Sequence, residues 1–123
     1  MNKFYITTAI DYVNASPHIG HVLEKIQADV LARYHRLRGD EVFYLTGADE
    51  HGAKIARAAL KAKKEPQKFV DATVEEFKAL KSALNLSWDD FIRTSDRERH
   101  WPAVELMWKK LVEAGDIYKK TYK

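Results

Sequence analysis

Apolar side chains recur along the start of the chain in two different patterns. Residues 4–8, which read FYITT, form a short apolar and β-branched run that predicts a buried strand. The next pattern has spacings of three and four residues, which predicts one apolar stripe along a helix. The stripe consists of Leu23, Ile26, Val30, Tyr34 and Leu37. Ser16 is a favourable N-cap, Pro17 a favourable first helical residue and Gly39 a favourable helix end, so the helix is expected between these positions.

The rest of the chain predicts a second strand and further helices. Residues 42–45 are apolar or aromatic and are expected to form the strand, which Thr46 and Gly47 should end. Amphipathic segments predict helices over about residues 50–63, 70–84 and 104–111. Residues 89–94 fit either a short strand or a connection.

The order of these elements predicts an α/β fold. Two strands joined by a helix of about 20 residues favour a right-handed parallel crossover. That unit opens a doubly wound sheet, so we expect the first half of a Rossmann-like parallel sheet with additional helices. Ligands of such sheets bind beyond the carboxyl ends of the strands, which here are residues 9–17 and 46–52.

Composition narrows the class of protein. The chain has 123 residues, of which 46% are hydrophobic and 32% charged, and this is typical of one globular, water-soluble domain or part of one. The absence of cysteine excludes disulfides and thiolate zinc ligands. No apolar run approaches the ~20 residues of a membrane span, and no signal-peptide core follows Met1, so a cytoplasmic location without membrane contact is expected.

A small basic excess lies at the end of the chain. The formal net charge is +3, and Lys119, Lys120 and Lys123 supply an amount equal to it. Such a tail is either a solvated chain end or a weak contact for RNA phosphates.

Two histidines begin the first predicted helix. His18 and His21 are three residues apart, so on a helix they share one face beside the free N–H groups and the positive end of the helix dipole. Gly20 between them lacks a Cβ and would let a ring or sugar approach the backbone. Two imidazoles that donate hydrogen bonds to phosphate could stabilise a pentacoordinate phosphorus, which indicates nucleotidyl transfer from ATP. The alternatives are surface histidines, or a metal site shared with Asp49, Glu50 or His51.

The chain closely resembles methionyl-tRNA synthetases, a family of class I aminoacyl-tRNA synthetases. The resemblance begins in the two loops, at residues 8–14 (TAIDYVN), 17–21 (PHIGH) and 45–52 (LTGADEHG). It continues in residues 27–34, 36–39, 91–96 and 115–118, so matching blocks cover nearly the whole chain in the right order. The resemblance implies the class I synthetase form of the Rossmann-like sheet. It also implies ATP-dependent activation of methionine to methionyl-adenylate, followed by transfer to tRNA.

The resemblance implies roles for individual residues. His18, Gly20 and His21 match the family's ATP-binding signature, with both histidines catalytic on the triphosphate and the glycine near the adenosine. Tyr12 and Asn14 lie in the same loop and are expected to contribute to ATP binding.

Methionine is expected to bind between the two loops. Ile10 and Tyr12 match residues that enclose the methionine side chain, and apolar or aromatic walls suit a thioether. Asp49 matches the aspartate that pairs with the substrate ammonium, although it could instead cap the next helix. ATP with Mg²⁺ is expected as a substrate.

Some positions depart from the family pattern or have no counterpart in it. Asp11 stands where the family usually has an apolar or aromatic residue, which places a negative charge beside the ATP loop, and Ala9 stands where many members have proline. Trp88, Trp101 and Trp108 match no functional residue and are expected to be core or helix-packing side chains.

Parts that the family usually has do not occur in the sequence. It has no zinc-binding insertion, no lysine-rich loop and no anticodon-binding domain, so residues 1–123 are interpreted as the N-terminal half of the catalytic domain, with no zinc bound by this segment. The remainder of the synthetase chain, and tRNA through it, are the expected partners. Without the lysine loop the chain should bind ATP weakly and be a poor or inactive catalyst. Half a sheet exposes a strand edge and a helix face, so self-association or marginal stability is expected.

Two alternatives belong to other classes. A small stand-alone nucleotidyltransferase shares the His-x-Gly-His motif and is of similar length, but usually has a glycine-rich turn before the histidines, unlike residues 11–14 (DYVN). A non-catalytic nucleotide- or RNA-binding module has the basic tail as its only specific support.

Overall fold

The computed structural model describes residues 2–121. The elements are, in order, β1 (Lys3–Thr7), β2 (Asp11–Tyr12), α1 (Ile19–Leu37), β3 (Glu41–Asp49), α2 (Ala53–Lys61), α3 (Pro66–Ala83), β4 (Asp90–Arg93) and α4 (Trp101–Glu113). Lys123, one of the three lysines of the expected basic tail, lies outside the described residues.

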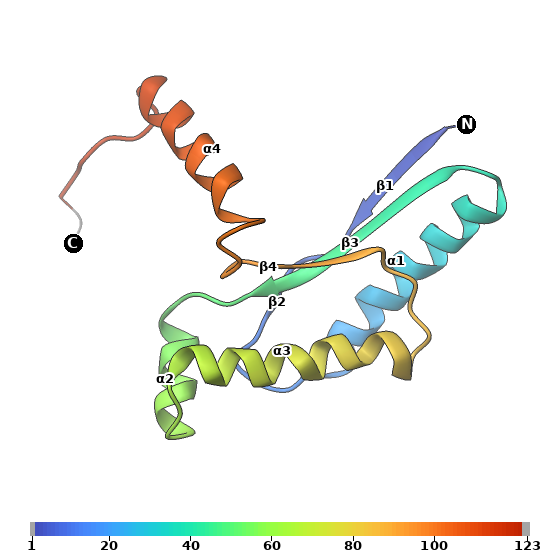
Figure 1. Ribbon diagram of the computed structural model, residues 1–123, viewed down its shortest axis with the longest axis horizontal. Coiled ribbons are helices and arrows are strands. Elements are labelled where there is room, and N and C mark those ends of the chain that lie inside the picture. Colours follow the sequence, from blue (N-terminus) through green and yellow to red (C-terminus); the bar gives the residue numbers. More distant parts are fainter. Residues whose placement is uncertain (1, 122–123) are drawn as a thin grey trace.

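The strands form one parallel sheet with β3 in the middle (Figure 1). Ala48 of β3 has Asp11 of β2 on one side and Arg93 of β4 on the other, so β2 and β4 lie along opposite edges of β3. Leu45 separates β1 from β4 in the same way, so β1 and β2 follow one another along one edge. This arrangement confirms the predicted parallel crossover.

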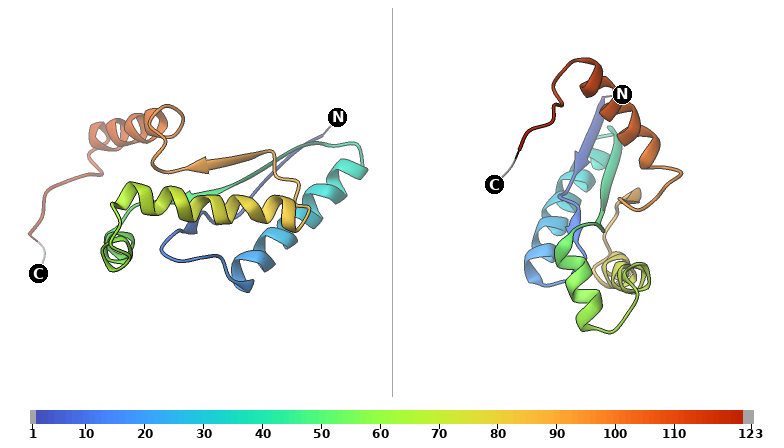
Figure 2. Two further views of the ribbon diagram at one scale, coloured as in Figure 1. Left: turned by 60° about the horizontal axis from the view of Figure 1, so that its bottom comes forward. Right: turned by 90° about the vertical axis from the view of Figure 1, so that its left-hand side faces the viewer.

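α1 and α3 cover the same face of the sheet, and α4 lies on the other side of the strands (Figures 1 and 2). Tyr44 packs with side chains of α1, and Ala48 packs with side chains of α3. These two residues of β3 point to the same face because successive strand residues alternate in direction. The core therefore consists of two clusters beneath the helices, one around Tyr44 and Trp88 and one around Phe77 and Val74.

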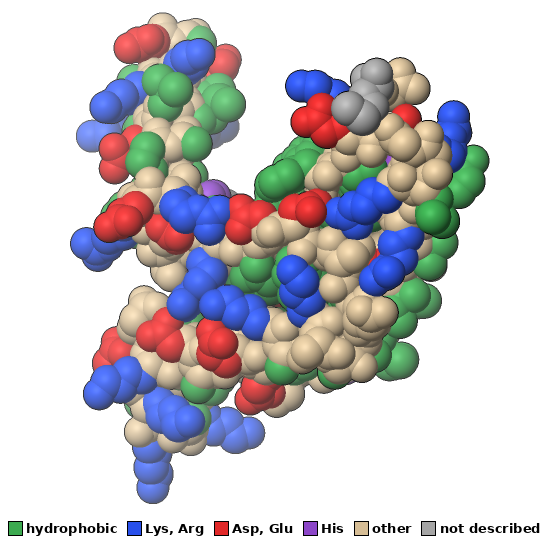
Figure 3. Space-filling model, turned by 45° about the vertical axis from the view of Figure 1, so that its right-hand side comes forward, with side chains coloured by type: hydrophobic (Ala, Val, Ile, Leu, Met, Phe, Trp, Pro, Cys, Tyr) green, Lys and Arg blue, Asp and Glu red, His purple; other side chains and the backbone are tan. Residues whose placement is uncertain are grey.

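α1 turns its predicted apolar stripe outward. Leu23, Val30 and Leu37 are 57%, 59% and 89% exposed. The buried residues of α1 are Lys25, Ala28, Asp29 and Ala32. The helix that the stripe predicted is therefore present, but the face against the sheet is a different one, where Ala28 and Ala32 allow close packing. The exposed stripe follows the α1 side of the molecule in Figure 3.

β3 is longer than predicted. It runs from Glu41 to Asp49, so Thr46 and Gly47 do not end it. Gly47 instead permits close packing against β4, because a Cβ at this position would lie 2.4 Å from the carbonyl oxygen of Ile92. Residues 89–94, which fitted a strand or a connection, contain the strand β4.

The helices after β3 are a short α2 and a long α3. α2 begins at Ala53 rather than near residue 50. Pro66 occupies the first position of α3, where its missing N–H costs no hydrogen bond. The Glu65 carboxylate accepts a hydrogen bond from the Lys68 N–H at 2.9 Å and caps this helix.

α4 projects from the body of the molecule (Figures 2 and 3). None of its residues is buried, and its apolar side chains face outward. The tryptophan prediction is therefore right for Trp88, which is 4% exposed, and wrong for Trp108, which is 58% exposed. Trp101 is partly buried and donates its indole N–H to the Thr94 carbonyl at 3.1 Å. No helix within residues 2–121 is both long and apolar enough to span a bilayer.

Candidate active site at the strand ends

The two histidines of the motif cap the N-terminus of α1. The Gly20 N–H donates to Nδ1 of His18, and the His18 N–H donates to Nδ1 of His21, both at 3.1 Å. His18 is therefore the N-cap, and the sequence-based assignment of this role to Ser16 is wrong. The imidazoles do the capping that a serine hydroxyl or aspartate carboxylate does in other helices.

This capping fixes the tautomer of both rings. Because Nδ1 accepts a backbone N–H in each ring, the proton of the neutral imidazole lies on Nε2. Within residues 2–121 neither Nε2 has a hydrogen-bond partner, so both can donate to a ligand. The rings stack with centroids 3.7 Å apart, and His21 also lies edge-on to Phe77 of α3 at 5.2 Å.

His21 is held in its neutral form. Burial lowers its pKa, and the neighbouring His18 and Lys25 lower it further, while Asp11 acts in the opposite direction. A neutral ring at pH 7 offers a hydrogen bond rather than a charge. The positive field at this position comes from the end of the helix.

Gly20 makes room for the His18 ring. A Cβ at Gly20 would lie 3.0 Å from Cε1 and 3.1 Å from Nδ1 of His18. Glycine at this position is therefore needed for the position of the His18 ring, in addition to the expected approach of a nucleoside.

The residues expected to enclose methionine share one region of the sheet. Tyr12 and Asp49 are direct partners in the β2–β3 pair, so their side chains leave the sheet on the same face. The Cγ2 atom of Ile10 lies close to Gly47, at 3.1 Å from where a Cβ would be. Gly52, at φ +116°, leaves space for the Tyr12 hydroxyl, which would be 2.1 Å from a Cβ there.

Asp49 does not cap the next helix. The N-cap of α2 is Gly52, which has no side-chain cap. The Oδ1 atom of Asp49 accepts the His51 N–H at 3.2 Å, which closes the turn after β3. Its other oxygen is free for a ligand, since among residues 2–121 no partner of Oδ2 is found.

The alternative of a metal site with the loop histidine is not supported. No group of three or more histidine, aspartate or glutamate side chains within residues 2–121 is placed to hold a metal ion. Glu50 is buried and paired with Arg93, and its carboxylate also accepts the Ser95 hydroxyl. His51 lies 3.3 Å from the Thr94 carbonyl.

Asp11, the departure from the family pattern, does not face the ATP loop as a free charge. Its carboxylate forms an ion pair with Lys25, and both side chains are almost completely buried, at 3% and 0% exposure. Sequence reasoning missed Lys25, although it stands one turn after His21 and off the apolar stripe. Burial raises the pKa of Asp11, and the contact with Lys25 opposes this rise.

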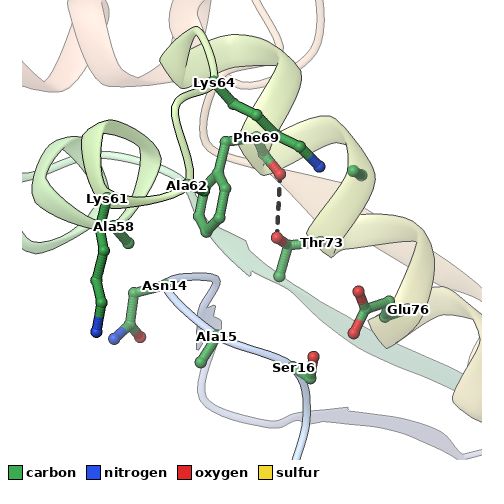
Figure 4. Close-up of a pocket in the computed structure, with 11 residues that line it drawn as sticks. Asn14, Ala15, Ser16, Ala58, Lys61, Ala62, Lys64, Phe69, Thr73 and Glu76 are labelled. Carbon is green, nitrogen blue, oxygen red and sulfur yellow. Dashed lines mark hydrogen bonds between the residues drawn. The ribbon is translucent and has the colours of Figure 1, made fainter.

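Asn14 is an exposed residue of the loop that precedes His18. It lines a cavity of about 530 Å³ between the loop after β2, the end of α2 and α3 (Figure 4). Lys61 and Lys64 stand at the same cavity, and Phe69 lies on its wall. The structure thus brings His18, Gly20 and His21 together, and Ile10, Tyr12 and Asp49 together, while Asn14 faces a third environment.

Comparison with known proteins decides the family. The profile described as "tRNA synthetases class I (M)" matches residues 4–123. The chain belongs to this class I tRNA synthetase family. Methionine–tRNA ligases of Rickettsia bellii and Thermotoga maritima are 50% and 51% identical to it over 121 residues, which is 98% of this chain. The Mycobacterium tuberculosis methionyl-tRNA synthetase, solved in complex with methionyl-adenylate, superimposes with a TM-score of 0.96 at 43% identity over 99% of this chain.

The class I synthetase relatives are much longer. The chain spans 24% of the R. bellii ligase, 19% of the T. maritima ligase and 24% of the M. tuberculosis chain. The structural likeness confirms the predicted class I synthetase sheet. Since these relatives are ligases, the alternatives of a small nucleotidyltransferase or a non-catalytic binding module are not favoured.

Proposed function

We propose that this chain is the part of a methionine–tRNA ligase that binds ATP, with Mg²⁺, and one side of methionine. The observation that carries the proposal is the pair of imidazoles at the start of α1, whose Nδ1 atoms are occupied by backbone N–H groups and whose Nε2 atoms are free donors. Together with the helix dipole, these donors favour an anionic ligand such as a triphosphate.

The reaction needs charge stabilisation at phosphorus. The methionine carboxylate oxygen forms a bond to the α-phosphorus of ATP, and the bond from that phosphorus to the bridging oxygen breaks, so pyrophosphate leaves with its electron pair. No proton has to move between the reactants. The Nε2–H groups of His18 and His21 donate hydrogen bonds to the triphosphate oxygens as negative charge grows there. Gly20, which has no Cβ, lets the adenosine approach the backbone.

Methionine binds beside the ends of β2 and β3, next to the ATP site at the start of α1. The Asp49 carboxylate binds the α-ammonium, because a fixed carboxylate gives a strong charge-assisted hydrogen bond. Ile10 and Tyr12 form the apolar and aromatic wall for the thioether. Tyr12 and Asn14 lie in the loop between the two substrates and contribute to ATP binding.

Transfer of the methionyl group to tRNA belongs to the complete enzyme. The relatives are at least four times as long as the matched segment, so tRNA binding and the remainder of the active site are assigned to chain outside these residues. A cytoplasmic location, where tRNA is charged, goes with this function.

ATP binding tests the proposal. We expect the chain to bind MgATP weakly in isothermal titration calorimetry, and His21→Ala to weaken binding by about tenfold or more, as for loss of a donor to a charged group. His35→Ala, a change in the last turn of α1, is the matched control and should leave binding unchanged. Equal affinity for the His18→Ala/His21→Ala double variant and the unmodified chain would refute the assigned role.

Pyrophosphate exchange tests the amino acid. Exchange into ATP that only methionine stimulates supports the ligase, whereas exchange with a different acceptor points to another nucleotidyltransferase. Silence with every amino acid, together with ATP binding that depends on His21, is the result expected of a segment that needs the rest of the enzyme.

A further inference from the structure

Three tethers join the start of α1 to the strands beneath it. Lys25 pairs with Asp11 of β2 in the interior. The Glu24 carboxylate accepts the Ala9 N–H at 2.8 Å, and the Tyr44 hydroxyl donates to the Lys25 carbonyl at 3.1 Å. All three involve the turn that directly follows His21.

The tethered residues alternate with those proposed to bind methionine. Ala9 and Asp11 are held by α1, while Tyr12 leaves β2 on the opposite face of the sheet from Asp11. Ile10, between Ala9 and Asp11 in the chain, lies against Gly47 of β3. The contacts with α1 therefore hold the backbone of residues 9–12, and this also sets the position of Ile10 and Tyr12 on the substrate side.

The buried ion pair needs an explanation other than stability. Asp11 Oδ2 and Lys25 Nζ have no hydrogen-bond partner other than each other within residues 2–121. Removing two charges from water is costly, and apolar replacements of a buried pair are often neutral or stabilising. A lysine ammonium with a single carboxylate partner is thus a poor way to hold two elements together, but an effective way to fix their register.

We propose that Lys25, Asp11 and Glu24 are positioning residues that set the imidazoles of the α1 N-terminus relative to the methionine side of the loop. This inference rests on the proposed function for its consequence, the binding of ATP beside methionine. The pair acts through His21, which stands four residues before Lys25 on the same helix face, stacks on His18 and lies edge-on to Phe77. Loss of the pair lets α1 slide on the sheet and turns the Nε2 atoms away from their ligand.

The test uses the whole 123-residue chain and a double variant without the charges, Asp11→Asn with Lys25→Met. Its matched control is Asp29→Asn with Arg33→Met, which removes another ion pair of α1, one to two turns farther along the helix. Asp29 also binds Ser87 there. Three quantities are measured: the urea midpoint of unfolding, the NMR shifts of the His21 ring protons, and the dissociation constant for MgATP.

If the Asp11–Lys25 pair positions His21, the three measurements should change in a specific combination. The Asp11/Lys25 double variant should keep its urea midpoint, while the ring protons of His21 lose the shift that the neighbouring His18 and Phe77 rings cause. MgATP should bind at least about tenfold more weakly. The Asp29/Arg33 control should lower the urea midpoint but leave the His21 shifts unchanged and the MgATP affinity within about twofold. A double variant with unchanged His21 shifts and unchanged MgATP affinity would overturn the inference.

Two further outcomes remain decisive. If the double variant does not fold, Glu24→Ala removes the second tether from a partly exposed side chain, and unchanged His21 shifts in that folded variant contradict the inference. If the unmodified chain binds no MgATP, the proposed function fails for this chain, but the His21 shifts still show whether the tethers position the ring.

Discussion

At the scale of single residues, the candidate site depends on unusual uses of common side chains. Histidine serves as helix cap at His18 and as its reciprocal partner at His21. The sequence identified the pair and its place at a helix start, because the motif follows a strand and precedes an amphipathic segment. It did not identify the cap, since Ser16 is the better N-cap by residue preference and the geometry of the rings depends on Gly20 and Phe77.

Gly20→Ala separates the needs of the helix from those of the site. Alanine favours the helix by up to about 1 kcal/mol, but its Cβ displaces the His18 ring and weakens the cap by a similar amount. We therefore expect the free energy of unfolding to change by less than about 1 kcal/mol, while MgATP binding weakens clearly. Urea unfolding and calorimetry measure the two effects, and an alanine variant with full ATP affinity would show that the His18 ring position does not matter.

The lowered pKa of His21 predicts how stability depends on pH. The folded chain holds this ring neutral, so below the ordinary histidine pKa of about 6.5 the unfolded state binds more protons and stability falls as pH decreases. Above that value the contribution of His21 is fully present. Urea unfolding between pH 5 and 7.5 should show a shallower pH dependence for His21→Ala than for the unmodified chain, and identical profiles would contradict the assigned neutral state.

At the scale of elements, α1 shows most clearly what a sequence pattern leaves out. The spacing of apolar residues correctly predicted a helix and nearly its length, because any amphipathic pattern of this period favours one. It did not predict which face is buried. The face against the sheet is chosen by Ala28 and Ala32, which allow close approach, and by the partners of Asp29 and Lys25, which lie far away in the sequence.

Substitutions on the face of α1 against the sheet should therefore change the free energy of unfolding more than substitutions on the apolar stripe. Ala32 is fully buried against the sheet, so Ala32→Leu should lower the free energy of unfolding by about 1–3 kcal/mol through overpacking. Leu37 is 89% exposed, and Leu37→Ala should change it by less than about 0.5 kcal/mol. Chemical denaturation of the two variants checks this, and a larger loss for Leu37→Ala would mean that the outer face is covered.

At the scale of the whole molecule, the fold is one part of a sheet with uncovered apolar surfaces. The stripe of α1, the stacked Tyr5 and Phe43 on the open face of the sheet, and the outer face of α4 are all exposed. The strand order and the parallel crossover followed from the sequence of strands and helices, since handedness and loop lengths allow few alternatives. The exposure of these surfaces could not be predicted, because an apolar pattern does not specify which partner covers it.

Exposed apolar surface of this extent predicts self-association of the 123-residue chain. Sedimentation velocity should show species larger than a monomer at micromolar concentrations, and Val30→Glu with Tyr34→Lys on the α1 stripe should reduce them. The exchange of Glu75 and Lys78, an exposed ion pair on α3, is the control and should have no effect. A monomeric chain with a sharp unfolding transition at all concentrations would refute the prediction.

The central claim is that the free Nε2 atoms of His18 and His21 bind the triphosphate, and NMR of the histidine side chains observes these atoms directly. We predict that titration of the ¹⁵N-histidine-labelled chain with MgATP shifts the Nε2 signals of His18 and His21 in proportion to saturation and leaves those of His35 and His100 in place. Binding of MgATP that leaves the His18 and His21 signals unmoved would contradict the account.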